Sequence, residues 1–154
     1  MKRLSTIGML ILLGVSMAVC LPITLWAATC TVTATPIAFG NYDPFAAAPR
    51  NRTGRITAVC NGNGTLTVAL STGQSGAYNP RSMISGTTTD NLDYNLYTTA
   101  ARVIIFGDGT AGTQTVSKNF NNKTVRIRVY GQIPAMENIA PGSYIDNITA
   151  TITF

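Results

Sequence analysis

The chain ends on the stretch YIDNITATITF, residues Tyr144 to Phe154, in which apolar and polar side chains alternate up to the last residue. In an extended strand, one face then carries Tyr144, Ile148, Ala150, Ile152 and Phe154. The opposite face is mostly threonine. Such a strand needs a neighbour on each edge, or a place at the edge of a sheet. We therefore expect a terminal core strand of eleven residues, with no later strand of this chain to cover its open edge.

The composition predicts a single all-β domain. The chain has 154 residues, of which only 11% are charged, and it contains 14 glycines and 7 prolines. That length is typical of one domain. After the signal-like first residues, no window repeats apolar residues at the helical period. We expect no helix longer than a short turn.

Short alternating stretches, separated by glycine, asparagine and aspartate, predict about seven antiparallel strands. The expected strands are Thr31–Thr35, resumed over Ile37–Phe39, then Ile56–Cys60, Leu66–Leu70, Leu92–Tyr97, Val103–Phe106, Val125–Tyr130 and the terminal strand. Strands at this spacing favour an immunoglobulin-like β-sandwich.

The segments between these strands are expected to be loops and turns. Gly40–Gly54 holds two prolines and is expected to be a loop, and Asn61–Gly64 is expected to form a tight turn of the kind found in hairpins. Thr72–Asn91 is longer than an ordinary hairpin loop. It is either a mobile surface element or holds a short strand around Arg81–Ile84.

The same long segment contains a candidate adhesive patch. Its apolar side chains Tyr78, Met83 and Ile84 can form an exposed surface that grips hydrophobic material. The alternative is that these side chains pack back against the domain.

The first residues have the layout of a secretory signal. Lys2 and Arg3 precede the apolar run Leu4–Leu21, and Pro22 follows it. A membrane anchor is the alternative, but no basic flank follows the run. We expect a signal peptide over residues 1–28 and one domain over residues 29–154, exported through the inner membrane to the periplasm and then to the cell surface or medium.

Two cleavage sites are compatible with this signal. Cleavage after Ala27 or Ala28 leaves a chain that starts beside Cys30. Cleavage after Ala18 leaves a short alternating arm and the odd Cys20. The later site is preferred, because an unpaired thiol is a liability in an oxidising compartment.

Cys30 and Cys60 remain after the later cleavage and are expected to form a structural disulfide. The bridge would close a loop of about 30 residues, which the chain-entropy model values at roughly 3.6 kcal/mol. The chain has no histidine, which removes the usual general base at neutral pH and a common metal ligand. Its acidic residues show no paired spacing. We expect no catalytic residues, no cofactor, no metal and no small-molecule substrate.

The charge of the mature chain is moderately basic. Without Lys2 and Arg3, nine basic residues stand against six acidic ones, a net charge of +3. Arg126 and Arg128 are expected on the outward face of a strand. This charge serves solubility, or attraction to anionic surfaces. Nucleic acid is not an expected partner, because basic and aromatic residues are not interleaved.

Four pieces of the sequence, in order, resemble the spore coat protein U domain. They are Cys30–Val32 with Ala38–Pro44, Leu92–Tyr97 with Arg102, Phe106–Asp108, and Val129–Pro134 with Pro141–Asp146. The resemblance covers essentially all of residues 30–154. The family includes subunits of Csu-type pili, the archaic branch of the chaperone–usher system.

The resemblance implies an immunoglobulin-like β-sandwich that lacks its last strand. In this family the gap is filled first by a periplasmic chaperone and then by the N-terminal arm of the neighbouring pilin subunit, with export through an outer-membrane usher. By this resemblance, Ile148, Ala150, Ile152 and Phe154 form one wall of the groove. The protein is then a subunit of an adhesive pilus that supports biofilm formation.

The position in the fibre depends on the mature N-terminus. A chain that starts beside Cys30 has no arm to donate and takes a tip position, whereas a start after Ala18 allows an internal one. The alternative function is a free secreted coat or matrix protein, which fills its own groove with a segment such as Thr110–Asn122.

Overall fold

The computed structural model describes residues 28–154. Except for Ala28, the predicted signal peptide lies outside the described residues, and so do the Ala18 cleavage site and Cys20. No helix in residues 28–154 has the length and apolarity needed to cross a bilayer. The strands of this part are β1 (Thr29–Thr35), β2 (Arg50–Asn61), β3 (Asn63–Leu70), β4 (Arg81–Ser85), β5 (Asn91–Tyr97), β6 (Val116–Asn121), β7 (Thr124–Ile133), β8 (Tyr144–Ile145) and β9 (Ala150–Thr153).

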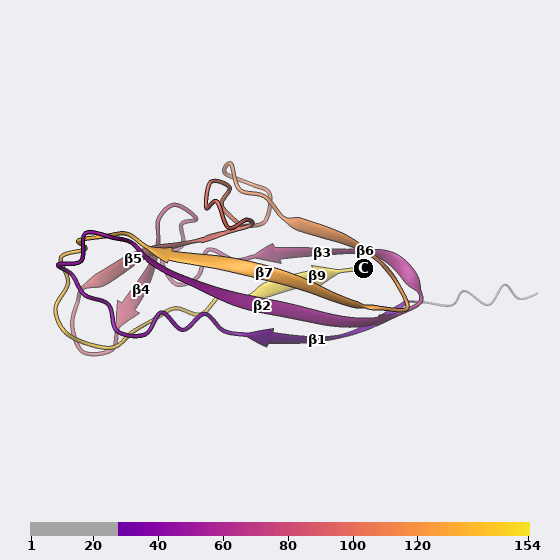
Figure 1. Cartoon of the computed structure of the whole chain (residues 1–154), viewed down its shortest axis with the longest axis horizontal. Helices are drawn as coiled ribbons and strands as arrows, with labels where there is room; N and C mark the ends of the chain where they lie inside the picture. Colours follow the sequence, from indigo (N-terminus) through magenta and orange to yellow (C-terminus); the bar gives the residue numbers. More distant parts are fainter. Residues whose placement is uncertain (1–27) are drawn as a thin grey trace, which may run out of the picture.

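These strands form two antiparallel sheets. The larger has the order β1-β2-β7-β5-β4-β8, and the smaller has the order β6-β3-β9. Figure 1 shows β2 and β7 running through most of the long axis, with β3, β6 and β9 at one end of it. The core between the sheets includes the buried side chains of Ile56, Leu66, Val68, Phe106, Ile127 and Ile133. The prediction of an all-β, incomplete immunoglobulin-like sandwich is confirmed.

The central pair of strands follows the predicted alternation. β2 and β7 pair over ten residues each, from Arg50 opposite Ile133 to Val59 opposite Thr124. Apolar positions of both strands face the core, and Arg126 and Arg128 face outward, as predicted. β2 begins earlier than expected. Its first part, Arg50–Gly54, is a strand rather than a loop because it pairs with the end of β7.

The turn after β2 is not a hairpin turn. β2 and β3 belong to different sheets, so Asn61–Gly64 carries the chain across the sandwich. The turn between β6 and β7 makes the same crossing beside it. The backbone N–H of Gly62 donates to Oδ1 of Asn122 at 2.6 Å, and the N–H of Asn122 donates to the carbonyl of Gly62 at 2.8 Å. These bonds tie the two sheets together at this end.

Four other segments differ from the expected strands or complete them. Ile37–Phe39 and Val103–Phe106 are not strands, although Phe39 and Phe106 are buried in the core. The long segment Thr72–Asn91 holds a strand, β4, which confirms the second of the two alternatives for it. β6 was not expected, because only one of its side chains, Phe120, is buried.

The expected terminal strand of eleven residues is wrong as a single element. Tyr144–Ile145 pairs with β4 in the larger sheet, whereas Ala150–Thr153 pairs with β3 in the smaller one. The chain changes sheets at Asp146, whose carboxylate accepts hydrogen bonds from the Tyr94 hydroxyl at 2.6 Å and the Gln74 backbone N–H at 2.8 Å. Anchoring this carboxylate beside β5 prevents a continuous strand.

Candidate functional site

An open groove separates β1 from β9 at one side of the sandwich. Its volume is about 510 Å³. Within the described residues, β1 pairs only with β2 and β9 pairs only with β3. The groove therefore has an unpaired strand edge on each side. Its apolar lining includes Ile37, Ile56, Leu70, Met83, Leu96, Val129 and Ile148.

The inward face of β1 is uncovered. Val32 lies opposite Ala58 and Ala34 lies opposite Ile56, and both of these β2 partners are buried. Val32 itself is 36% exposed, and Ala34 is also exposed. Side chains on the core face of a strand are ordinarily buried. Here the element that would cover them is missing from this part of the chain.

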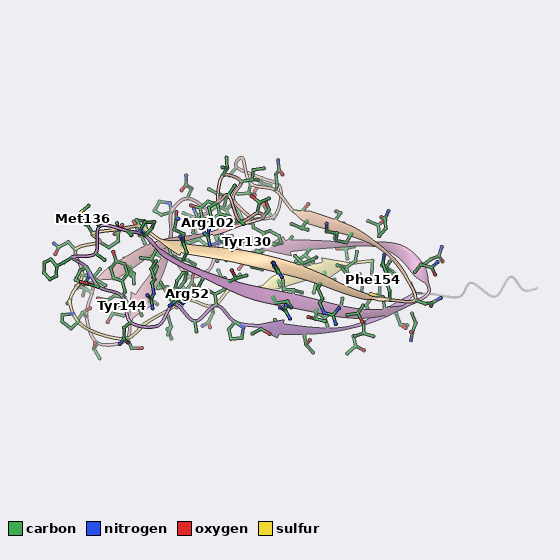
Figure 2. All side chains as sticks on the ribbon, viewed as in Figure 1. Arg52, Arg102, Tyr130, Met136, Tyr144 and Phe154 are labelled. Atoms are coloured by element: carbon green, nitrogen blue, oxygen red, sulfur yellow. A yellow bond between two sulfur atoms is a disulfide. The ribbon has the colours of Figure 1, made fainter. Side chains whose placement is uncertain are left out.

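β9 shows the same incomplete burial. Ala150 and Ile152 lie opposite Leu70 and Val68, which are both buried, yet Ala150 and Ile152 are only partly buried. Phe154 is 51% exposed and is labelled near the end of the smaller sheet in Figure 2.

The four residues that were expected to form one wall of the groove lie at different positions relative to it. Ile148 and Ala150 line the groove, and Ile152 packs against the core beyond it. Phe154 stands at the chain end. Their role in binding a strand remains a prediction.

The predicted disulfide is confirmed and fixes the edge strand β1. Cys30 and Cys60 are directly opposite each other on β1 and β2, and their sulfur atoms are bonded. β1 has no second neighbouring strand in the described chain. The bridge therefore holds the beginning of β1 against the sheet while its other edge is free.

A buried arginine, which the sequence reasoning missed, lies on β4 opposite Tyr94, a residue of the groove lining. Arg81 is 0% exposed. Its guanidinium donates to the carbonyls of Ser71 at 2.9 Å and Phe106 at 2.7 Å, and to Oδ1 of Asn95 at 3.0 Å. Burial lowers the pKa of Arg81. Its partners come from three separate segments, so Arg81 joins the end of β3 to β5 and to the loop after it.

This arginine is connected to β9 through Ser71. The backbone N–H of Ser71 donates to the carbonyl of Thr149 at 2.9 Å, and the Thr149 N–H donates to the Ser71 hydroxyl at 2.9 Å. Nearby, Tyr94 donates to Asp146. Burial, followed by this hydrogen bond, raises the pKa of Tyr94. The buried polar groups thus hold both ends of the segment that leads into β9.

The candidate adhesive residues do not come together. Met83 is buried and lines the groove, while Tyr78 lies against Arg81, with its ring centroid 5.1 Å from the guanidinium carbon. Ile84 faces the other way on β4 and is exposed. The alternation of β4 separates Met83 from Ile84, so the three side chains form no single exposed patch. Their adhesive role remains untested.

Two exposed apolar side chains that the sequence reasoning missed lie on neighbouring loops. Phe45 is 90% exposed and Met136 is 66% exposed. The Tyr42 hydroxyl joins their loops, because it donates to the Pro134 carbonyl and accepts from the Glu137 N–H, both at 2.8 Å. Figure 2 shows Met136 at the end of the molecule opposite Phe154.

Comparisons with known proteins agree with this fold. The model of the Spore Coat Protein U domain matches residues 16–151. Protein U of Myxococcus xanthus is 32% identical over 127 residues, which cover 75% of this chain and 70% of that protein.

A solved structure has a similar fold. It is the pre-assembly complex of CsuC and CsuE, a chaperone and tip adhesion subunit, from the archaic chaperone–usher Csu pili of Acinetobacter baumannii. One of its chains matches with a TM-score of 0.61 and 22% identity, over 83% of this chain and 40% of that one. From the family match and the relative in Myxococcus xanthus together, this chain belongs to the Spore Coat Protein U domain family.

Proposed function

We propose that this protein is a structural subunit of an adhesive pilus on the cell surface, assembled by donor-strand complementation through a chaperone–usher pathway. The groove between β1 and β9 carries this proposal, because it combines two unpaired strand edges with uncovered apolar side chains on the core face. A periplasmic chaperone occupies the groove first. The N-terminal arm of a neighbouring subunit then replaces it at the outer-membrane usher.

The physical basis is the addition of one strand. Backbone groups of the incoming strand pair with the free edges, and alternate side chains enter the groove beside Val32 and Ile148. Burying about five apolar side chains at roughly 1.5–3 kcal/mol each is large compared with the ~5–15 kcal/mol stability of a domain. The free subunit is therefore poorly stable, and the complemented one is stable.

The similar solved structure supports this choice of partner. It is a complex between a chaperone and a tip adhesion subunit, captured before assembly. The segment Thr110–Asn122 does not supply the missing strand here. Its strand, β6, pairs with the edge of β3 opposite β9. This arrangement gives no support to a self-completed coat or matrix protein.

Co-expression with a chaperone of this pathway tests the proposal. We expect the full chain to copurify with the chaperone, and Ile152→Asp to abolish copurification, because the new charge faces the core side of β9. The matched control is Thr151→Asp on the outward face of the same strand, which should retain copurification. A soluble, cooperatively melting monomer without a chaperone would instead favour the free secreted protein.

The place in the fibre depends on the mature N-terminus. The family match begins at residue 16, upstream of Cys30, which supports a role for the segment before the first strand. A mature chain that starts after Ala18 has an arm to donate and occupies an internal position. A chain cut after Ala27 or Ala28 occupies the tip. Mass analysis of the secreted chain distinguishes the two positions.

We assign the adhesive contact to the exposed loops rather than to Tyr78, Met83 and Ile84. Phe45 and Met136 present apolar surface on two loops joined by hydrogen bonds. Phe45→Ser combined with Met136→Ser should reduce attachment of piliated cells to hydrophobic plastic, and with it biofilm mass, at unchanged pilus number. Unchanged attachment would remove the adhesive role of these loops.

A further inference from the structure

A second cleft, of about 470 Å³, lies between β6 and β7 and is lined by cations. Lys118 comes from β6, Arg126 and Arg128 come from β7, and Arg55 comes from β2. β7 pairs with β5 only over Tyr130–Gln132, so its earlier part has no neighbour on this edge within the described sheet. The volume falls in the usual range for ligand sites, roughly 300–1,000 Å³.

No carboxylate balances these cations. The six acidic residues of the whole chain are Asp43, Asp90, Asp93, Asp108, Glu137 and Asp146, and none lies on β2, β3, β6 or β7. Arg55 even stands directly opposite Arg128. Like charges in opposite positions destabilise a sheet. The Arg55–Arg128 pair therefore does not stabilise the sheet, whereas a cleft lined by one sign of charge concentrates ligands of the opposite sign.

The spacing of the cations favours a ligand with several charges. Arg126 and Arg128 lie two residues apart on one face of β7, which corresponds to about 6.8 Å along an antiparallel strand. Lys118 on β6 and Arg55 on β2 flank them from other strands. Four cations on three strands offer more positive charge than one small anion neutralises. A polymer with repeated negative charges can neutralise them.

The cleft lacks the stacking surface that single-stranded nucleic acid requires. Tyr130 is the one aromatic residue of its lining. The guanidinium carbon of Arg102 lies 5.9 Å from the centroid of that ring, and Figure 2 shows the two residues next to each other. Binding of single strands depends on free aromatic faces for the bases. An acidic carbohydrate needs no stacking surface, because the positive charges of the cleft and hydrogen bonds to the sugar hydroxyls are sufficient to bind it.

We propose that this basic cleft, defined by Arg55, Lys118, Arg126 and Arg128, binds acidic polysaccharide through its repeated carboxylate or sulfate groups. The inference rests on the proposed function only in placing the subunit outside the cell, where such polymers occur. The cleft shares only Arg55 with the lining of the β1–β9 groove, whereas Lys118, Arg126 and Arg128 lie outside that lining. A complemented subunit can therefore still present these three cations.

The test uses the full chain in its chaperone complex, with the chaperone alone as background. Its probes are dextran sulfate for sulfate groups, polygalacturonate for carboxylates, neutral dextran and duplex DNA. Arg126→Gln with Arg128→Gln removes two cations from the cleft. Arg52→Gln with Lys123→Gln removes the same charge outside its lining.

We expect the cleft pair, Arg126→Gln with Arg128→Gln, to weaken binding of at least one acidic polysaccharide at least tenfold. The control pair, Arg52→Gln with Lys123→Gln, should change this binding less than twofold. The slope of log affinity against log salt should fall by roughly two, because two fewer counterions are released. Equal losses in both pairs, or wild-type binding to duplex DNA as tight as to the acidic polysaccharides, would overturn the proposal. Copurification of each variant is recorded separately. If the wild type does not copurify with the chaperone, the proposed pilus function is contradicted. Binding of the polysaccharides is then measured on the free full chain.

Discussion

The sandwich has two open sides, and they differ in chemistry. Between β1 and β9 the lining is mostly apolar, and core-facing side chains such as Val32 are exposed. Between β6 and β7 the lining carries Lys118, Arg126 and Arg128, and the core-facing Val125 and Ile127 are already buried. Charged side chains on a strand edge discourage the addition of another strand. One side is therefore suited to a strand, and the other is suited to a charged ligand.

The largest expected effect comes from placing a charge on the apolar side. Val32→Asp should abolish chaperone capture, because the carboxylate faces the space that the incoming strand must fill. Thr33→Asp, on the outward face of the same strand, is the matched control and should leave capture intact. The measurement is the yield of each variant that copurifies with the chaperone. Equal loss in the two variants would mean that charge on β1, rather than the groove, is responsible.

A smaller but still large effect is expected at Arg81. Arg81→Met leaves two carbonyls and one amide oxygen without their charged donor, which should destabilise the chain by at least about 3 kcal/mol. Arg52→Met is the control, since exposed Arg52 donates only to the adjacent Asn51 carbonyl among the described contacts. Thermal unfolding of the two chaperone complexes gives the comparison. Equal melting temperatures would exclude a structural role for Arg81.

The pH dependence of stability should report on Tyr94 in the groove lining. Its pKa is raised above the ordinary value of 10.0 by burial and by Asp146. Folding therefore keeps the phenol protonated, and this contribution is lost as pH rises through 10, by up to about 1.4 kcal/mol per pH unit. Tyr94→Phe should flatten the alkaline part of the stability profile. An unchanged slope in urea unfolding of the complex above pH 10 would contradict this assignment.

The smallest effect, with the opposite sign, is expected on the basic side. Arg128→Glu places a carboxylate opposite Arg55 and should stabilise the sheet by roughly 0.2–1 kcal/mol. The same change should weaken binding of acidic polysaccharide. A variant that melts higher and binds less would show that these cations serve a ligand rather than the fold. Higher stability with undiminished binding would place the ligand elsewhere.

The sequence was sufficient for the elements that depend on local alternation. Strict alternation of Ile56, Ala58 and Cys60, and of Val125, Ile127 and Val129, predicted their strands and their buried faces. The disulfide followed from counting cysteines. The unfilled side of the sandwich was expected from the terminal strand and from the family resemblance.

The features that local alternation did not predict depend on contacts between residues far apart in the sequence. Asn61–Gly64 has the composition of a hairpin turn, and only its bonds to Asn122 show that it crosses between sheets. The break at Asp146 depends on Tyr94, 52 residues away. Arg81 appears in sequence as an ordinary surface cation, because the carbonyls that bury it lie on other segments.

Amide hydrogen exchange of the full chain, free and bound to its chaperone, tests the central claim most directly. The account predicts strong new protection of the unpaired amides of β1 and β9 on binding, with the β6–β7 side unchanged. Protection confined to the β6–β7 side, or no change at β1 and β9, would contradict the claim that the groove between β1 and β9 receives the missing strand.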